Sequence, residues 1–399
     1  MDILITIVCA TVVIGFIVLI HEGGHYLAAR AFGVRVSEFM LGLPGPSIGF
    51  TRGGTRFGVT AVPLGGYARI CGMEAGEMSP HLKSVLAALY ERGTTTIGEV
   101  AAACGISDDE AFEALEELVE WGSATGPAKG DPEDVYRAVA TTAPKARRAR
   151  RTRAKRRTVP IAAPEVGAAL QASDCTVVHA EPGAAAAASA YALGEPRPVA
   201  DPDALFAAEY SQQYRALPFW KRSVILLAGV AVNLLFAVLA FIVIYSVIGI
   251  DLQNTETGEV FHFNATPLQS IQAGFMYIVA VVQAVAGLFN PATAADTVSQ
   301  SSSIVGIAVM SRDFFEAGFV YALEFTAMIS VSVGIMNLIP IPPLDGGRFV
   351  VEIIQKIRRK PVSAKALGYA SWVGVGLFLV FFAIMVNQDI QRFIFGNWG

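Results

Sequence analysis

The five residues His21-Glu22-Gly23-Gly24-His25 constrain this chain more than any other feature, because they directly follow an apolar run, Ile3 to Ile20. On a helix, a His-Glu-x-x-His pattern places two imidazoles one turn apart on one face, with a carboxylate beside them. Zinc hydrolases use this arrangement to supply two neutral nitrogen ligands and a general base. Here the helix is predicted to lie in a bilayer, where ionisable groups are costly and by default functional.

A chance match at the end of a membrane helix is the alternative interpretation, because short motifs recur and polar residues are common at such positions. The chain holds only five histidines, however, and two of them stand at ligand spacing. We therefore interpret His21 and His25 as metal ligands and Glu22 as the base that accepts a proton from water.

A second motif supplies a candidate third ligand. The sequence Asn-Leu-Ile-Pro-Ile-Pro-Pro-Leu-Asp-Gly-Gly-Arg, residues 337–348, ends another apolar run, Phe319 to Ile339. Catalytic zinc usually has three protein ligands and one open position. Asp345 follows a proline-rich stretch that must leave regular helix. Alone, this stretch is equally a turn signal. Together with the first motif it predicts a Zn²⁺ site made by His21, His25 and Asp345.

The composition is that of a membrane protein, with 53% hydrophobic and 16% charged residues and four cysteines that show no CxxC spacing. Four apolar runs approach the ~20 residues needed to cross a hydrocarbon core. They are Ile3–Ile20 with a continuation to about Phe32, Val224–Ile248, Phe319–Ile339 and Ala370–Val386. We therefore predict an all-α polytopic membrane protein with about four transmembrane helices.

Basic residues set the predicted orientation. The segment between the first two spans holds most of the Lys and Arg residues, and more follow the third span, so both regions are expected to be cytoplasmic. Both termini then lie outside, in a multi-pass protein of the cell inner or plasma membrane. A crossing by the further apolar stretch Gln269–Phe289 would place Asp345 opposite His21. We therefore interpret that stretch as a helix on the outer surface or against the bundle.

At this point the chain resembles the site-2 protease family of intramembrane zinc metalloproteases, and most of all its bacterial branch that cleaves anti-sigma factors, the regulator-of-sigma-E-protease-like branch. The resemblance covers a little over half of the chain. Its motifs occur in family order, at His21–Tyr26, Val62–Tyr67, Ala228–Asn233 and Asn337–Arg348. The chain departs from the family at Val230, where proline is usual, and has no room between residues 250 and 267 for a PDZ domain.

The resemblance implies a zinc metalloendopeptidase whose substrate is a single transmembrane helix. It also implies a candidate set of substrate-binding residues, namely Asn233, Asn337, Gly65 and Gly66. Hydrogen bonding between helices is an equally weighted alternative for the two asparagines. A catalytically inactive membrane scaffold and a metal transporter remain alternative functions. The presence of all four zinc-site residues disfavours the first, and a transporter would not require Glu22 beside the ligands.

Residues 37–72 are rich in glycine and alternate like a strand around Arg56–Val62. We predict a small membrane-associated β-hairpin that approaches the active site. Extended backbone at membrane depth needs hydrogen-bonding partners, and a substrate unwound into a strand could supply them by strand addition. An ordinary cytoplasmic hairpin packed against the bundle is the alternative.

A soluble helical insert is predicted between the first two spans. A turn at Gly105 and a capping signal at Ser107 and Glu110 resemble a helix-turn-helix or winged helix. The second helix, Asp108–Trp121, is acidic, which disfavours nucleic acid and favours a protein partner. Nine basic residues lie in Lys145–Arg157. Such a run is usually solvated, but it can also bind anionic lipid on the bilayer surface.

The predicted organisation has four parts. They are residues 1–80 with the first span and the β-structure, 81–143 with the insert, 144–208 as a basic, Ala/Pro-rich flexible linker, and 209–399 with the remaining membrane core.

Overall fold

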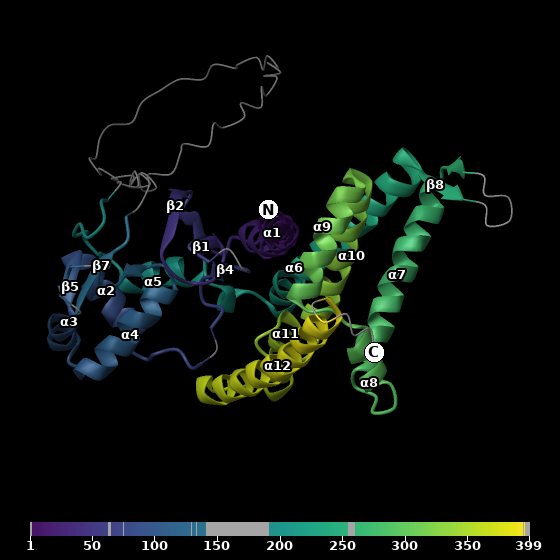
Figure 1. The fold of residues 1–399 in the computed structure, drawn as a ribbon. Helices are drawn as coiled ribbons and strands as arrows, with labels where there is room; N and C mark the ends of the chain where they lie inside the picture. The colour runs from purple at the N-terminus through teal and green to yellow at the C-terminus, as the bar shows by residue number, and fades with distance from the viewer. Residues whose placement is uncertain are drawn as a thin grey trace, which may run out of the picture.

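The computed structural model describes residues 2–62, 65–74, 76–128, 130–132, 134–140, 191–253, 260–393 and 395. Most of this part of the chain is helical (Figure 1). The helices are α1 (Asp2–Ala31), α2 (Leu82–Arg92), α3 (Ile97–Cys104), α4 (Asp108–Glu120), α5 (Pro202–Tyr210), α6 (Phe219–Ile242), α7 (Pro267–Gly287), α8 (Ala294–Gln300), α9 (Ile304–Ala317), α10 (Phe319–Asn337), α11 (Asp345–Arg358) and α12 (Ala364–Phe393). The strands are β1 (Val36–Leu41), β2 (Ser47–Arg52), β3 (Thr55–Thr60), β4 (Gly66–Ile70), β5 (Thr94–Thr96), β6 (Ala124–Thr125), β7 (Val135–Ala138), β8 (Ile250–Gln253) and β9 (Val260–Phe263).

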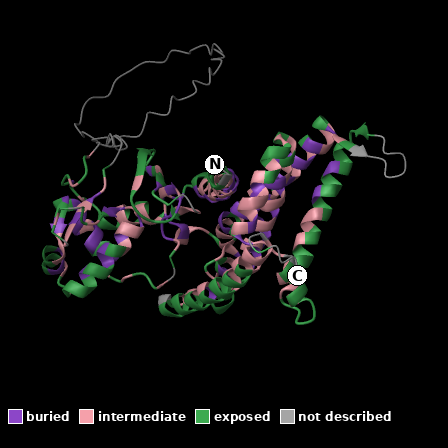
Figure 2. Cartoon of the chain, in the orientation of Figure 1, coloured by how far each residue is buried: buried purple, intermediate pink, exposed green. Residues whose placement is uncertain are grey.

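Five of the described helices are long and apolar enough to cross a membrane, one more than the four expected. They are α1, α6 with its π-helical continuation to Ile248, α7, α10 and α12. Protein buries only 11% of the apolar window of α7 and 6% of that of α12, and both are largely exposed in Figure 2. Apolar surface of this extent requires a bilayer or a partner to cover it.

Helices α1 and α6 pack antiparallel and form the base of the active site. The ring of Phe16 contacts that of Phe236 at 5.1 Å. Nine residues further along α1, His25 Nδ1 lies 2.8 Å from the carbonyl oxygen of Ile225. The opposite directions of the two sequences show that the helices run antiparallel. Residues near the start of α6 therefore lie level with the end of α1.

Helix α10 is also antiparallel to α6. Tyr245, in the π-helical turn after α6, donates a 2.6 Å hydrogen bond to Glu324 near the start of α10. Further along, Ser330 donates a 3.1 Å hydrogen bond to the carbonyl oxygen of Asn233. The end of α10 at Asn337 therefore returns to the level of α1 that carries the His-Glu-x-x-His motif.

The segment around Gln269–Phe289 forms α7, which runs back along α6 from a 2.6 Å contact between Ser246 and Ser270. Helix α9 then runs in the other direction and joins α10 at a tight turn at Gly318, so that Phe314 stacks on Phe325 with ring centroids 4.7 Å apart. Helix α7 therefore packs against the bundle, which was one of our two interpretations of this stretch. Because α9 runs opposite to α7, a crossing by both helices would still leave Asp345 on the side of His21.

Helix α12 contacts the end of the bundle that carries the zinc motifs. Asp389 accepts hydrogen bonds from the backbone N–H groups of Ser303 and Gly306 at the start of α9. Gly374 packs directly on the carbonyl of Pro342. In Figure 1, α12 lies beside α11 at this end of the bundle. Both parts of α12 thus contact the same end of the bundle, and these contacts do not test on which side of the membrane the C-terminus lies.

The antiparallel course of α7 can be tested by labelling. A single cysteine in place of Lys360 should react with a membrane-impermeant reagent only from the side that holds the insert, and one in place of His262 only from the opposite side. A cysteine in place of Ala292, an exposed residue beyond α7, should react like Lys360, because α7 carries the chain back across. Labelling of the Ala292 variant from the side of His262 would show that α7 does not cross.

Strands β1 to β4 form one sheet in the order β2-β3-β1-β4, which is larger than the hairpin we predicted. β1 pairs parallel with β3 and antiparallel with β4. The outer strand β2 exposes apolar side chains: Ile48 is 88% and Phe50 is 64% accessible. β4 is the edge strand next to α1, so the outer edge of the sheet, which has no strand partner among the described residues, faces the helix with the His-Glu-x-x-His motif.

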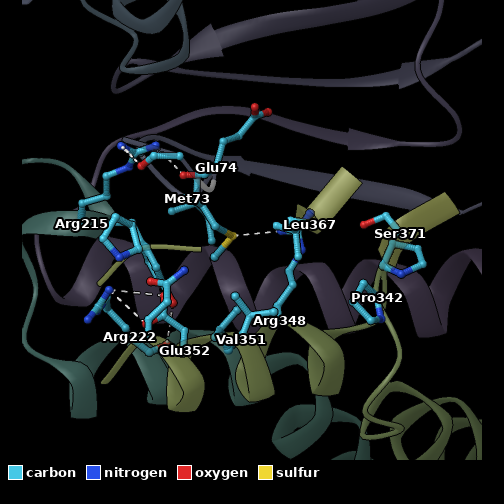
Figure 3. A pocket seen from close by; sticks show the side chains of 18 of the residues that line it. Met73, Glu74, Arg215, Arg222, Pro342, Arg348, Val351, Glu352, Leu367 and Ser371 are labelled. Carbon is cyan, nitrogen blue, oxygen red and sulfur yellow. Dashed lines mark hydrogen bonds and ion pairs between the residues drawn. The ribbon is translucent and has the colours of Figure 1, made fainter. Parts of the chain in front are cut away.

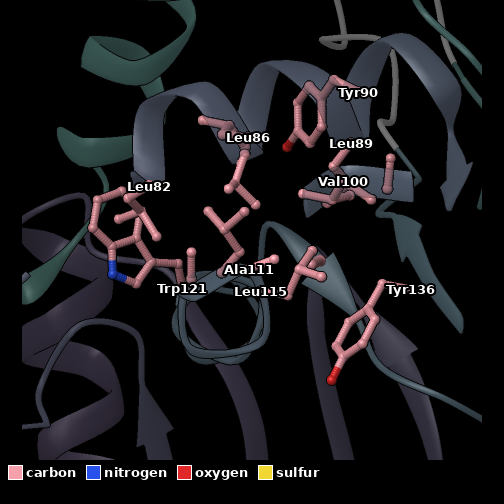
Figure 4. Packing of buried hydrophobic residues seen from close by; sticks show 14 of the residues in the cluster. Leu82, Leu86, Leu89, Tyr90, Val100, Ala111, Leu115, Trp121 and Tyr136 are labelled. Carbon is pink, nitrogen blue, oxygen red and sulfur yellow. The ribbon is translucent and has the colours of Figure 1, made fainter. Parts of the chain in front are cut away.

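The insert has its own hydrophobic core (Figure 4), in which Leu86, Leu115, Trp121 and Tyr136 are fully or almost fully buried. Helices α2, α3 and α4 pack with the antiparallel sheet β5-β7-β6. Both α3 and α4 begin with a complete capping box, which satisfies backbone N–H groups that would otherwise lack partners. The predicted cap at Ser107 is therefore confirmed.

The insert also includes residues that we assigned to the linker. Helix α5 begins at Asp201, whose side chain accepts hydrogen bonds from the backbone, with Pro202 at the first helical position. Its Phe206 and Tyr210 pack on the insert core beside Trp121. Residues 191–210 therefore belong to the insert, while the basic tract Lys145–Arg157 lies outside the described residues.

Arg35, which follows α1, connects the insert to the membrane core through hydrogen bonds and an ion pair. Its guanidinium donates hydrogen bonds to the carbonyl oxygens of Trp121 and Gly122, at 3.3 and 2.8 Å, and pairs with Glu209 at 2.9 Å. Nearby, Glu120 lies against Glu74 of the segment that follows β4. Burial, followed by the hydrogen bond and charge of Glu74, raises the pKa of Glu120 to about 8.

This carboxyl pair predicts a pH dependence of the insert's stability. Because the pKa of Glu120 is higher in the folded than in the unfolded chain, the folded state holds an extra proton between about pH 4.5 and 8. The contribution is full below that range and is lost as the pH rises through it. We expect the thermal midpoint, followed by tryptophan fluorescence, to fall over this range in the native chain and less in Glu120→Gln. Glu113→Gln, at an exposed position of α4, is the control. A midpoint that rises with pH would contradict the pairing.

Candidate active site

The three residues predicted to hold metal meet at one point. Nε2 of His21 and Nε2 of His25 each lie 3.1 Å from the same oxygen, Oδ2 of Asp345, and 3.3 Å from each other. Both histidines are 6% exposed. The chain thus brings residues 21, 25 and 345 together in one cluster of metal-ligating atoms, in which the histidines are buried and Asp345 is partly buried.

The spacing of these atoms fits zinc. Ligands about 2.0–2.1 Å from a tetrahedral ion are separated from one another by roughly 3.3 Å. The three atoms are 3.1 to 3.3 Å apart. Two imidazoles and one carboxylate, with one side open, are also the ligand set of many catalytic zinc sites. The residues therefore suit Zn²⁺ in both chemistry and geometry.

The surroundings of His25 set its tautomer. Its Nδ1 lies 2.8 Å from the carbonyl oxygen of Ile225, which can only accept a hydrogen bond. Nδ1 therefore carries the proton, and the Nε2 lone pair is free to bind metal. The antiparallel packing of α1 on α6 provides this carbonyl, so the helix pair orients the ligand.

Asn233 plays the corresponding part for His21. Its side-chain nitrogen lies 3.3 Å from His21 Nδ1, and its side-chain oxygen is buried without a partner. The two amide atoms are interchangeable in shape. With the amide turned over, its oxygen accepts a hydrogen bond from His21 Nδ1–H. That arrangement again leaves Nε2 free for metal, so Asn233 is a positioning residue for the ligand.

Glu22 lies beside the cluster and is held by the sheet. Its Oε2 accepts a 3.0 Å hydrogen bond from the backbone N–H of Ala68 in β4. Gly66 of the same strand approaches within side-chain contact of Val18 and Glu22, and a Cβ at this position would lie 2.7 Å from Val18. The edge strand, the carboxylate and the ligands therefore form one continuous surface.

Two glycines permit the close approach of α1 and α6. A Cβ at Gly24 would lie 2.6 Å from the carbonyl oxygen of Ala228. A Cβ at Gly229 would lie 2.3 Å from His25 Nε2 and 2.8 Å from His21 Cε1. Gly229 thus leaves the space in which the two imidazoles turn toward Asp345. Neither glycine was predicted to have a role, although small residues at helix contacts are a known signal in membranes.

Asp345 is the first residue of α11 and is placed by the turn before it. The proline-rich segment leaves the helix as predicted, and α11 folds back onto it at Gly346 and Gly347. A Cβ at Gly346 would lie 2.2 Å from the carbonyl oxygen of Leu338, so only glycine fits.

A cavity of about 360 Å³ opens onto this cluster. Among the predicted substrate-binding residues, Gly65, Gly66 and Asn337 line it. Asn233 does not, and it is fully buried. Three of the four residues thus line this cavity, and their role in substrate binding stays a prediction. The structure places Asn233 behind a ligand, in the helix-packing position that was the alternative.

Comparison with known proteins agrees with this geometry. The pattern of peptidase family M50 matches residues 9–381. A zinc metalloprotease candidate of Brucella suis is 24% identical over 408 residues, which cover 96% of this chain and 95% of that protein. A similar candidate of Rhizobium meliloti is 26% identical over 400 residues, covering 95% and 94%. Zinc metalloprotease RasP of Geobacillus kaustophilus is 35% identical over 109 residues, 27% of this chain and 26% of RasP.

The family match extends over nearly the whole chain and includes both zinc motifs. The relatives' names agree with a zinc ion as the metal. This chain belongs to peptidase family M50, the site-2 protease family, and is a zinc metalloendopeptidase of the site-2 type.

Proposed function

We propose that this enzyme cleaves single-span membrane proteins within the bilayer, as a step of regulated intramembrane proteolysis, and that anti-sigma factors are among its substrates. The observation that carries the proposal is the meeting of His21, His25 and Asp345 beside Glu22, at the ends of helices apolar enough to span a membrane. A protease for soluble substrates has no need of a buried site flanked by lipid-facing helices.

The residues divide the chemistry as follows. His21, His25 and Asp345 would hold zinc, which when bound supplies a Lewis acid for the scissile carbonyl and for water. Glu22 accepts the proton of the attacking water and returns it to the leaving amine nitrogen. The backbone N–H of Ala68 holds the Glu22 carboxylate in place through its 3.0 Å hydrogen bond. Asn337, whose side-chain nitrogen is 3.4 Å from His21 Nε2, is positioned to donate a hydrogen bond to the substrate carbonyl.

The edge of β4 would receive the substrate. A transmembrane helix must unwind before its backbone can be cleaved, and its N–H and C=O groups then need new partners. β4 is the outer strand of its sheet and leads into the cavity beside Glu22. Pairing with β4 would hold the unwound segment as an added strand. Residues that break helices inside the substrate span lower the cost of this unwinding.

The direct test is reconstitution of the purified enzyme in detergent with tagged single-span proteins, some with an Asn-Gly pair in the apolar span and some without. We expect cleavage inside the span of the interrupted substrates, dependent on zinc and absent in Glu22→Gln. An enzyme that binds zinc but cleaves no single-span protein would support the alternative of an inactive scaffold. Anti-sigma factors enter the same assay as candidates.

For the insert we propose a contact with a protein partner rather than with nucleic acid. Helix α4, which would be the DNA-reading helix of a helix-turn-helix unit, exposes Asp108, Asp109 and Glu113. These charges would repel phosphates. The proposal that Lys145–Arg157 binds anionic lipid rests on its charge alone. Cosedimentation with anionic and neutral vesicles, beside a duplex-DNA shift assay, tests both statements.

We further propose that the insert is cytoplasmic and that the protein lies in the cell inner or plasma membrane. The basic residues that flank the spans on the insert side support this orientation.

A further inference from the structure

A second cavity adjoins the active site on the side of the insert. Its volume is about 590 Å³, and it shares Tyr67, Ala68, Ile70, Met73 and Arg348 among its lining residues with the cavity at the zinc ligands. One wall is formed by β4 and the segment that follows it, and the opposite wall by α11 and the start of α12. A strand added to β4 would therefore run from the ligands into this second cavity.

The wall formed by α11 is one face of the helix, and it begins at a zinc ligand. Arg348, Val351, Glu352 and Gln355 line the cavity at the spacing of one helical face. Asp345 lies one turn before Arg348 on this face, about 4.5 Å along the helix axis. The first side chain that a substrate meets beyond the zinc ligands on this wall is therefore Arg348.

The charges of the second cavity are unbalanced. Four arginines and two glutamates line it, namely Arg69, Arg215, Arg222, Arg348, Glu74 and Glu352. Three of the arginines have a carboxylate partner: Arg222 pairs with Glu352 at 3.0 Å, Arg215 with Glu117 at 3.6 Å and Arg69 with Glu38 at 3.6 Å. Glu74 lies against Glu120 instead, and Arg348 is the one lining arginine without an ion pair among the described residues.

Arg348 reaches across the cavity without meeting a carboxylate of the described residues. Its Nη1 lies 3.1 Å from Met73 Sδ on the opposite wall (Figure 3). A thioether is a weak acceptor and leaves most of the five N–H donors of the guanidinium unused. A guanidinium matches a carboxylate through two parallel hydrogen bonds. The junction of the two cavities thus offers an acidic group a positive charge and unused hydrogen-bond donors.

We propose that Arg348 is a specificity-determining residue that binds an Asp or Glu side chain of the substrate, on the insert side of the scissile bond. This inference rests on the proposed cleavage of single-span proteins. An extended chain advances about 3.3 Å per residue, and the Arg348 side chain reaches beyond the ~4.5 Å that separates it from Asp345 along the helix axis, so the acidic residue stands a few positions from the bond that is cut. Binding of the carboxylate displaces Met73 from the guanidinium and fixes the register of the substrate strand.

The test uses a tagged single-span protein whose span carries an Asn-Gly pair, with Asp or Asn placed two, three or four residues from the mapped cleavage site on the insert side. We expect the wild-type enzyme to cleave one Asp substrate with about tenfold higher kcat/KM than its Asn counterpart, mainly through KM. In Arg348→Gln the ratio of the two rates falls to about one, and Arg348→Lys retains part of the preference. Arg348→Glu reverses it, so that a Lys substrate is favoured over the Asp substrate.

Two controls separate the outcomes. Lys356→Gln removes a charge of α11 that lies over the Phe219 ring, outside the cavity, and should leave the Asp preference unchanged. Substrate binding is also measured in the inactive Glu22→Gln background, where Arg348→Gln should remove the difference in Kd. Cleavage of Asp and Asn substrates at equal rates by the wild-type enzyme would overturn the role of Arg348 but leave the proposed function intact. Absence of cleavage of every single-span substrate would overturn both.

Discussion

Replacement of Glu22 by Gln is expected to abolish peptide-bond cleavage and to leave zinc bound. The amide keeps the shape of the side chain and can still hydrogen-bond, but it cannot accept the proton of the attacking water. Loss of general acid–base catalysis typically costs about 10²–10⁴-fold in rate. We expect a loss at the upper end of this range or beyond it, because the same carboxylate serves in both proton transfers. Zinc content per protein and cleavage rate are measured on the same preparation.

Glu38→Gln is the matched control for this variant. Glu38 lies in β1 of the same sheet, where it pairs with Arg69 at 3.6 Å and accepts a 3.3 Å hydrogen bond from Tyr67. It does not line the cavity at the zinc ligands, so cleavage should continue in this variant. Activity retained in Glu22→Gln would remove Glu22 from the mechanism, and loss of zinc would show that the carboxylate supports the metal site instead.

Replacement of Gly229 by Ala is expected to empty the zinc site although no ligand is changed. The new methyl group would stand 2.3 Å from His25 Nε2 and 2.8 Å from His21 Cε1, distances at which atoms overlap. The imidazoles must turn away from Asp345 or the two helices must separate. Disturbance of a ligand's supporting contacts typically costs about 10–100-fold in metal affinity, and displacement of the ligands themselves should cost at least as much. The measurements are zinc affinity and cleavage rate.

Gly23→Ala is the control, because Gly23 lies beside Gly24 in α1 but away from the contact with α6. A Cβ at Gly23 meets nothing within 4 Å, and alanine favours helix over glycine by about 1 kcal/mol. This variant should therefore keep zinc and activity, whereas Gly24→Ala, directed at the carbonyl oxygen of Ala228, should resemble Gly229→Ala. Normal zinc affinity in Gly229→Ala would show that α1 and α6 pack less closely than the structure indicates.

The comparison of α5 with α9 shows why some elements escaped prediction. Asp201-Pro202 is a recognisable helix start, but α5 is only nine residues long, and the surrounding Ala- and Pro-rich composition outweighed that signal. Its role depends on Phe206 and Tyr210 reaching the insert core from across a long intervening segment. Helix α9 has fourteen residues, too few for a typical span. Its importance is topological and depends on the turn at Gly318.

The sequence by itself determined the chemistry of the site and the membrane character of the chain. The spacing of His21, Glu22 and His25 on a helix is local, and so is the length of an apolar run, so both can be recognised without knowledge of packing. How Asp345 comes to lie beside His21 and His25 could not be predicted in the same way, because it depends on contacts between residues far apart in sequence. Helix α9 returns the chain so that Asp345 reaches His21, Gly229 makes room for both imidazoles, and Asn233 turns inward to orient a ligand rather than outward to a substrate. The position of Arg348 between two cavities follows in the same way from the packing of α11 against β4 and the segment after it.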